Sequence, residues 1–122
     1  MMVVIFITLK KNECRIEETR MAIEVFIKRH IKQGPQARSV VPLILQLRAL
    51  ATFQPGYISG ETFFNLDNPE DCLVVSRWED REDWERWLRS EERSEIQQKI
   101  EALTDEQTEY TVYAPMVPGK KL

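Results

Sequence analysis

The chain has 122 residues and a net charge of -3, with 43% hydrophobic and 30% charged residues. This length suits one domain with one core, and the composition is that of an ordinary globular protein. Both signs of charge are mixed along the chain and no Lys/Arg run is longer than two residues. The basic surface typical of a nucleic-acid-binding protein is therefore missing, and we expect no nucleic-acid partner.

Cysteine usage and hydropathy exclude further classes of protein. Cys14 and Cys72 lie far apart and outside the spacings of zinc sites or disulfide frameworks, so we expect no metal and a reducing, cytoplasmic environment. The apolar run from Met1 to Leu9 is shorter than the roughly 20 residues that cross a bilayer, and it lacks the flanks of a signal peptide. We expect no membrane partner.

The first predicted strand covers residues 21–31, in which apolar and polar residues alternate. The apolar residues of one face are Ile23, Val25, Ile27 and Ile31. After Gly34-Pro35, Ser39 is a candidate N-cap for a helix over residues 39–53, where apolar residues recur at helical spacing. Pro42 is tolerated in that helix because it would fall in the first turn.

Residues 57–66 and 72–78 predict two strands of a hairpin, with a turn at 67–71 between them. Gly60 inside the first of these strands indicates a bulge or close approach by another backbone.

Two helical segments and a last strand complete the chain. Asp80 and Ser90 are the predicted caps of the two segments, and Thr104-Asp105 breaks the helical pattern. Residues 109–114 predict the last strand.

The element order is β-α-β-β-α-β. It predicts an α+β fold of the ferredoxin-like, split βαβ type, an antiparallel sheet with its helices on one face. Alternation assigns an apolar set to the other face, namely Phe26, Phe63, Val74, Trp78 and Tyr113. Such a patch is too apolar to remain in water, so the pattern predicts a two-fold homodimer that packs sheet against sheet.

Three runs of sequence resemble one known family. They are QPGYISGE at 54–61, LVVSRWEDREDWERWLRSEER at 73–93 and TEYTVYAP at 108–115, and together they resemble the antibiotic biosynthesis monooxygenase (ABM) domain over residues 21–115. The resemblance implies a dimeric α+β barrel with a ligand pocket between the sheet and the helices of each subunit. It also implies oxygenation of a small aromatic or quinol-like ligand without metal, flavin or other cofactor.

The same family contains haem-degrading members, which this chain matches poorly. Those members have an Asn on the first strand, a Trp on the second helix and a haem-ligating His. Trp87 matches the Trp, whereas Ile27 and Gln97 stand where the Asn and the His would be. Haem degradation is therefore not expected.

Two residues are candidates for catalysis. His30 has a side chain whose ordinary pKa lies near neutrality, which makes it the nominal general base; the alternative is a polar residue at the sheet interface or strand end. Arg77 is predicted to face the helices together with Val75, where its guanidinium would hold a substrate oxyanion or carboxylate. Its alternative is a surface side chain in a salt bridge.

Five further residues are predicted to contact the substrate in the pocket: Leu47, Phe64, Trp84, Trp87 and Gln97. Trp87 would stack on a flat substrate or else belong simply to the core. Gln97 would bind the ligand or else be an exposed helix residue. Phosphate loops, nucleophile elbows and metal-ligand clusters do not occur in the sequence.

Two functions of different classes remain after these exclusions. One is a cofactor-independent monooxygenase, and the other is a non-catalytic or regulatory small-molecule-binding dimer with the same fold. Residues 1–20 lie outside the resemblance, either as an extra strand or as sequence upstream of a native start at Met21, and residues 116–122 are expected to form a flexible tail.

Overall fold

The computed structural model describes residues 21–116. The hypotheses for residues 1–20, and the tail beyond Met116, lie outside these residues. The chain forms β1 (Ile23–His30), α2 (Pro35–Ala51), β2 (Tyr57–Phe64), β3 (Asp71–Trp78), α3 (Arg81–Leu88), α4 (Glu91–Thr104) and β4 (Glu109–Tyr113). The predicted β-α-β-β-α-β order is confirmed, with α3 and α4 as the two segments of its second helical unit.

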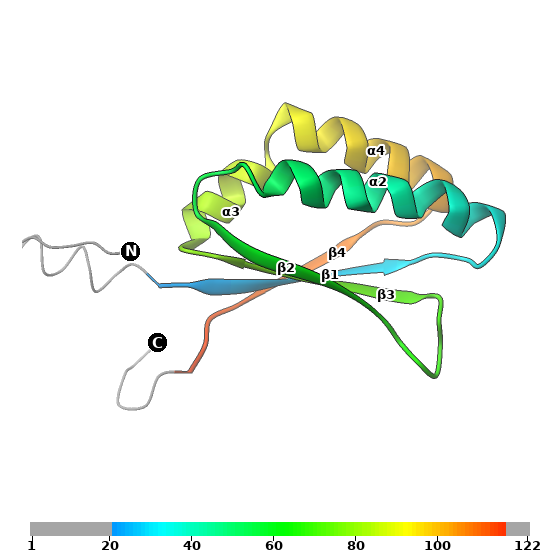
Figure 1. Cartoon of the computed structure of the whole chain (residues 1–122), viewed down its shortest axis with the longest axis horizontal. Helices are drawn as coiled ribbons and strands as arrows, with labels where there is room; N and C mark the ends of the chain where they lie inside the picture. The colour runs from blue at the N-terminus through cyan, green and yellow to red at the C-terminus, as the bar shows by residue number, and fades with distance from the viewer. Residues whose placement is uncertain (1–20, 117–122) are drawn as a thin grey trace, which may run out of the picture.

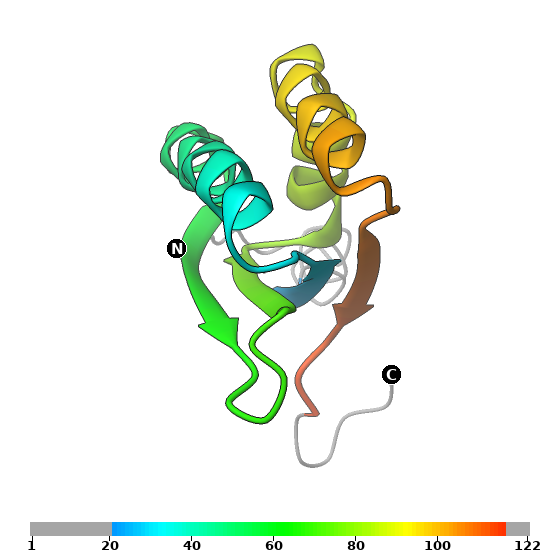
Figure 2. The same ribbon diagram turned by 90° about the vertical axis from the view of Figure 1, so that its right-hand side faces the viewer.

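The four strands form one sheet in the order β2-β3-β1-β4, and every neighbouring pair is antiparallel. All three helices cover the same face of this sheet and leave the other face open (Figure 1, Figure 2). This is the ferredoxin-like arrangement expected from the sequence. No helix among the described residues is long and apolar enough to cross a membrane.

The core lies between the sheet and the helices. β1 directs its odd-numbered residues toward the helices, and these are buried, as the alternation of the sequence predicts. The helix α2 covers them with a stripe of four buried residues, Val40, Ile44, Leu47 and Ala51. The same face of β1 also carries a residue that the sequence did not single out, Arg29, which is 6% exposed.

Helix α2 begins earlier than predicted, at Pro35 instead of after Ser39. Proline is favoured at the first helical position, because its fixed φ suits the helix and its missing N–H has no helical partner there. Gly34 precedes it with a φ of 85°, in the region that glycine occupies without strain. Pro42 consequently lies inside the helix, and the expectation that it falls in the first turn was wrong.

The predicted caps of the other two helices are confirmed. The carboxylate of Asp80 accepts a hydrogen bond from the backbone N–H of Asp83 at 3.1 Å, and the hydroxyl of Ser90 accepts one from the N–H of Arg93 at 3.2 Å. Helix α4 ends at Asp105, whose φ of 57° is left-handed.

The side-chain direction of β3 differs from the prediction. Val74 and Trp78 were expected on the open face but face the helices and are buried, whereas Val75 and Arg77 lie on the open face. A one-residue change of phase moves every side chain of a strand to the other face. β3 has apolar residues on both faces, so the alternation of its sequence could not show which residues face the helices.

The open face of the sheet nevertheless retains an apolar centre. Phe26 and Tyr113 contact each other edge to face, with ring centroids 4.9 Å apart. Phe63 and Tyr113 are 45% and 54% exposed. The sheet-to-sheet homodimer that this face suggests stays a prediction.

Candidate functional site

A cavity of about 50 Å³ lies between the sheet and the helices, with walls from β1, β2, β3 and all three helices. This volume has room for a few water molecules, and an aromatic ring enters only if a side chain at the rim moves. Arg48 is suited to that movement: it lines the cavity, is half-buried, and reaches from α2 to donate a hydrogen bond to the Thr62 hydroxyl on the edge strand β2.

Aromatic rings form one wall of the cavity. Tyr57 packs edge to face on Trp78 with centroids 5.3 Å apart, and Trp78 packs on Trp84 at 5.9 Å. The indole N–H of Trp78 donates to the Ser76 hydroxyl at 3.1 Å, so this buried donor has a partner. The wall is therefore apolar, rigid and suited to a flat ligand.

Gly60 allows Tyr57 to occupy its position. The β2–β3 register shifts between Tyr57 and Ser59, and a Cβ at Gly60 would lie 2.5 Å from the Tyr57 hydroxyl oxygen. The sequence predicted a bulge at Gly60 or close approach by another backbone; the irregularity instead lies between Tyr57 and Ser59, Gly60 pairs regularly with Ser76, and the close approach comes from the Tyr57 side chain. Burial raises the pKa of Tyr57, so its phenol stays neutral and can donate a hydrogen bond to a ligand.

Leu47, Trp84 and Trp87 also line the cavity, and all three are buried. The position predicted for them is therefore the observed one, and their contact with a substrate stays a prediction. For Trp87, the two readings of the sequence do not exclude each other, because the residue belongs to the core and to the cavity wall at the same time.

Two arginines reach the cavity from opposite sides. Arg29 comes from β1 and is 6% exposed, and Arg93 comes from α4 and is 4% exposed. Arg93 donates to the Tyr110 hydroxyl, and its guanidinium carbon lies 5.1 Å from the centroid of the Tyr110 ring and 5.8 Å from that of Trp84. These contacts are hydrogen-bonding and cation–π interactions, and neither supplies a negative charge.

Arg29 is incompletely satisfied. One of its terminal nitrogens donates to Gln97 Oε1 at 3.0 Å, while its Nε is buried without a hydrogen-bond partner. Burial lowers the pKa of Arg29, and the neighbouring Arg93 acts in the same direction. Arginine does not lose its proton in proteins, so the lowered pKa means that the charge is held at a free-energy cost.

Gln97 is buried, with 7% of its surface exposed, so the alternative prediction that it is an exposed helix residue was wrong. Its amide also donates to Glu101 Oε2 at 2.9 Å and to the Thr108 hydroxyl at 2.8 Å. Gln97 therefore holds the Arg29 side chain through a hydrogen bond, and Gln97 itself does not line the cavity. Phe64 is 48% exposed at the end of β2, away from this cavity.

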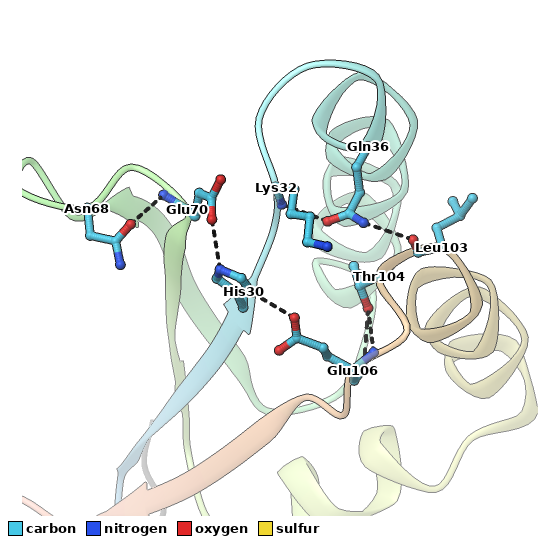
Figure 3. A network of polar contacts seen from close by, with 8 residues as sticks. All are labelled: His30, Lys32, Gln36, Asn68, Glu70, Leu103, Thr104 and Glu106. Carbon is cyan, nitrogen blue, oxygen red and sulfur yellow. Dashed lines mark hydrogen bonds and ion pairs between the residues drawn. The ribbon is translucent and has the colours of Figure 1, made fainter.

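His30 lies at the end of β1 in a polar cluster (Figure 3). Its Nδ1 is 2.7 Å from Glu106 Oε2 and its Nε2 is 2.9 Å from Glu70 Oε1. Hydrogen bonds to Glu106 and then Glu70 raise its pKa, which favours the imidazolium. The structure does not bring His30 to the cavity, so the geometry offers no support for its predicted role as general base.

Arg77 lies on the open face of the sheet, with its Nε 3.7 Å from Glu24 Oε2. The expectation that it faces the helices was wrong, for the reason given above for β3. The arginines that reach the cavity are instead Arg29, which shares the strand face of Ile27, and Arg93, which is buried on α4 with Ile96 and Ile100. The sequence allows both positions to be predicted. Arg29 is two residues from Ile27 on the same strand face, and Arg93 is at helical spacing from Ile96 and Ile100.

A second, wider hollow lies at the end of the sheet near Phe64, His30 and Glu106. It is rich in charged, exposed side chains, and two buried residues, Arg29 and Cys72, also line it. Burial raises the pKa of the Cys72 thiol beside it, so this cysteine is not an activated nucleophile. Among residues 21–116, no group of His, Cys, Asp and Glu could hold a metal ion.

Comparisons with known proteins agree on one family. The model of the antibiotic biosynthesis monooxygenase family matches residues 24–99. A search of curated proteins finds no significant relative.

Several solved structures share the fold. A conserved protein from Methanosarcina mazei is 26% identical, with a TM-score of 0.68 over 76% of this chain and 91% of that one. SnoaB, a cofactor-independent oxygenase from Streptomyces nogalater, is 14% identical, with a TM-score of 0.68 over 82% and 99%. A putative antibiotic biosynthesis monooxygenase from Nitrosomonas europaea is 10% identical, with a TM-score of 0.71 over 82% and 95%.

Proposed function

Because this chain belongs to the antibiotic biosynthesis monooxygenase family, we propose that it is a cofactor-independent monooxygenase of a small aromatic or quinol substrate. The observation that carries the proposal is the cavity walled by Tyr57, Trp78, Trp84 and Trp87, whose aromatic wall suits a flat, electron-rich ring once a rim side chain such as Arg48 moves. The similarity in fold to a cofactor-independent oxygenase supports it.

The reaction requires little from the protein beyond this environment. A phenol or anthrone-type substrate that has lost a proton can transfer an electron to O₂, and the two radicals then combine into a carbon-bound peroxide. Protonation of the peroxide and loss of water with the remaining C–H proton convert a CH₂ group and O₂ into a C=O group and H₂O. The cavity favours this sequence because its small volume leaves room for few water molecules beside the anion and the peroxide.

A second candidate function is binding without catalysis. No His, Asp or Glu side chain lines the cavity, so the residues that most often act as general bases are absent from its wall. A regulatory or carrier protein with this fold would need no such group.

We also propose that the chain works as a homodimer through the open face of the sheet. Apolar side chains are spread across that face, with Phe63 exposed on the edge strand β2, Tyr113 exposed on the opposite edge strand β4, and Phe26 of β1 in contact with Tyr113. Burial of such a surface stabilises association by about 25 cal/mol per Å² of apolar area.

Oxygen uptake tests the function. The full chain is given a panel of hydroquinones and anthrones, with and without added metal, flavin and haem, and uptake without any addition is the expected result. Ala51→Leu fills the cavity from α2 and should abolish uptake, whereas Ala49→Leu on the exposed side of the same helix should preserve it. Ligand binding without uptake for any substrate would favour the non-catalytic function.

A further inference from the structure

The cavity contains more positive charge than the protein balances. Arg29 and Arg93 are both more than nine-tenths buried, and both line the cavity. Neither makes an ion pair with any residue of the described part of the chain. Desolvating a guanidinium costs several kcal/mol unless an opposite charge or a full set of hydrogen bonds compensates.

Internal groups compensate these charges only in part. The negative charge of Glu101 raises the pKa of Arg29, but this carboxylate forms no ion pair with the arginine and accepts its hydrogen bonds from Gln97 and the Thr108 N–H. The Arg29 Nε donor remains without a partner. Arg93 is paired with a neutral phenol, that of Tyr110.

The remaining positive charge lies next to the aromatic wall. The guanidinium of Arg93 is within 5.8 Å of the Trp84 ring centroid, and Arg29 enters the same cavity from β1. A ligand that fills this space would place a ring against the indoles and its polar end between the two arginines. Guanidinium groups match the planar geometry of a carboxylate or other oxyanion.

We propose that the cavity binds its aromatic ligand as an anion, with a ring-borne oxyanion held by Arg29 and Arg93. The anion proposal names the substrate class of the monooxygenase proposed above, and as a statement about the substrate it rests on that function. The oxyanion is either a carboxylate or an ionised phenol. Both carry a negatively charged oxygen that a guanidinium can bind.

Anion binding also explains how a cavity without a carboxylate or imidazole in its wall activates a phenol. Two adjacent cations stabilise the phenolate over the phenol and lower the pKa of the bound ligand. The ligand then releases its proton to solvent as it binds, and the electron-rich anion is formed without a general base in the cavity.

Calorimetric titration of the full-length chain tests the proposal with matched probes. Benzoate should bind at least about ten times more tightly than benzamide, its neutral counterpart of the same shape. 4-Nitrophenol should bind with the absorbance of its phenolate at a pH where the free compound is largely protonated. Benzoate binding alone would identify the carboxylate as the preferred oxyanion, and phenolate binding alone would identify the phenol.

Variants assign the preference to the cavity. Arg29→Met should remove the difference between benzoate and benzamide, and Arg29→Lys should retain part of it. Arg77→Met removes an arginine from the same sheet on the open face and should leave the preference unchanged. Equal binding of benzoate and benzamide by the unmodified chain, or a preference that survives Arg29→Met, would overturn the proposal.

This experiment separates the two proposals. Anion-selective binding without oxygen uptake would leave the ligand class standing and reject the monooxygenase. Oxygen uptake on neutral substrates that is unaffected by Arg29→Met would support the monooxygenase and reject the anion site.

Discussion

At the scale of single residues, Arg29 is the clearest case of a side chain whose burial lowers the stability of the fold. A buried charge that is only partly compensated destabilises the ligand-free protein. Arg29→Met should therefore melt at the same temperature as the unmodified chain or higher, as followed by circular dichroism. A residue retained for structure behaves in the opposite way, so a clearly lowered melting temperature would contradict a ligand-binding role for Arg29.

His30 provides a pH-dependent contribution to stability. Its pKa is raised in the folded state by Glu106 and Glu70, so its contribution is fully present below the unfolded pKa of about 6.5. The contribution disappears as the pH rises through the folded pKa. The side chain is 37% exposed, so solvent weakens the effect.

Urea unfolding between about pH 5.5 and pH 8 measures this contribution. His30→Gln should remove the part of the pH dependence of the free energy of unfolding that comes from the imidazole. Lys28→Gln, which removes a charge from the same face of β1, is the control and should leave that dependence unchanged. His30 is the only histidine of the chain, so the assignment is unambiguous. An unchanged pH profile in His30→Gln would show that other groups control it.

The residue scale also shows what the sequence could and could not predict. Trp84, Trp87 and Leu47 line the cavity, as apolar residues at helical spacing do when they point to the core, and their contact with a substrate stays a prediction. Arg29 was missed, although its strand parity with Ile27 is readable, because a charged residue is rarely expected on a buried face. No pattern in the sequence gives the contact between Arg93 and Tyr110, which joins α4 to β4.

At the scale of elements, local signals predicted most boundaries. Asp80 and Ser90 cap their helices as expected, because an N-cap depends only on neighbouring residues. The start of α2 was misplaced because two plausible starts, Pro35 and Ser39, lie within one turn of each other. The phase of β3 depends on its hydrogen-bonded partners β1 and β2, and no local pattern contains that information.

The turn before β2 yields an element-scale prediction. Gly56 has a φ of 84°, and a Cβ there would lie 2.0 Å from Asp83 Oδ2 and 2.6 Å from Asp83 Cβ in the first turn of α3. Gly56→Ala combines backbone strain with a clash, and it should reduce the free energy of unfolding by about 2–4 kcal/mol.

Gly34 is the matched control for this substitution. Its φ of 85° is close to that of Gly56, its ψ of -133° also lies in a region that favours glycine, and nothing lies within 4 Å of the added Cβ, so Gly34→Ala should cost only backbone strain of about 1–3 kcal/mol. Chemical denaturation of both variants compares strain alone with strain plus the contact between the β2 turn and α3. Equal losses would show that Asp83 moves away without cost.

At the scale of the whole molecule, the homodimer is the main open prediction. Phe63→Lys puts a charge on the open face of the sheet at β2, and it should shift the protein to monomer or aggregate in light scattering at micromolar concentration. Leu45→Lys changes an apolar residue on α2 that is 56% exposed, against 45% for Phe63, and it should leave the dimer intact. An unmodified chain that is monomeric under these conditions would disprove the prediction.

The alternation of β1 has a consequence for the assembly as a whole. Ile27 and Arg29 enter the cavity, while Phe26 and Lys28, their neighbours in sequence, lie on the opposite face. One stretch of backbone thus contacts both the ligand space and the surface expected to meet a second subunit. If a bound anion changes the position of β1, it changes the affinity between subunits, and thermodynamic linkage requires dimerisation to change the affinity for the anion by the same factor.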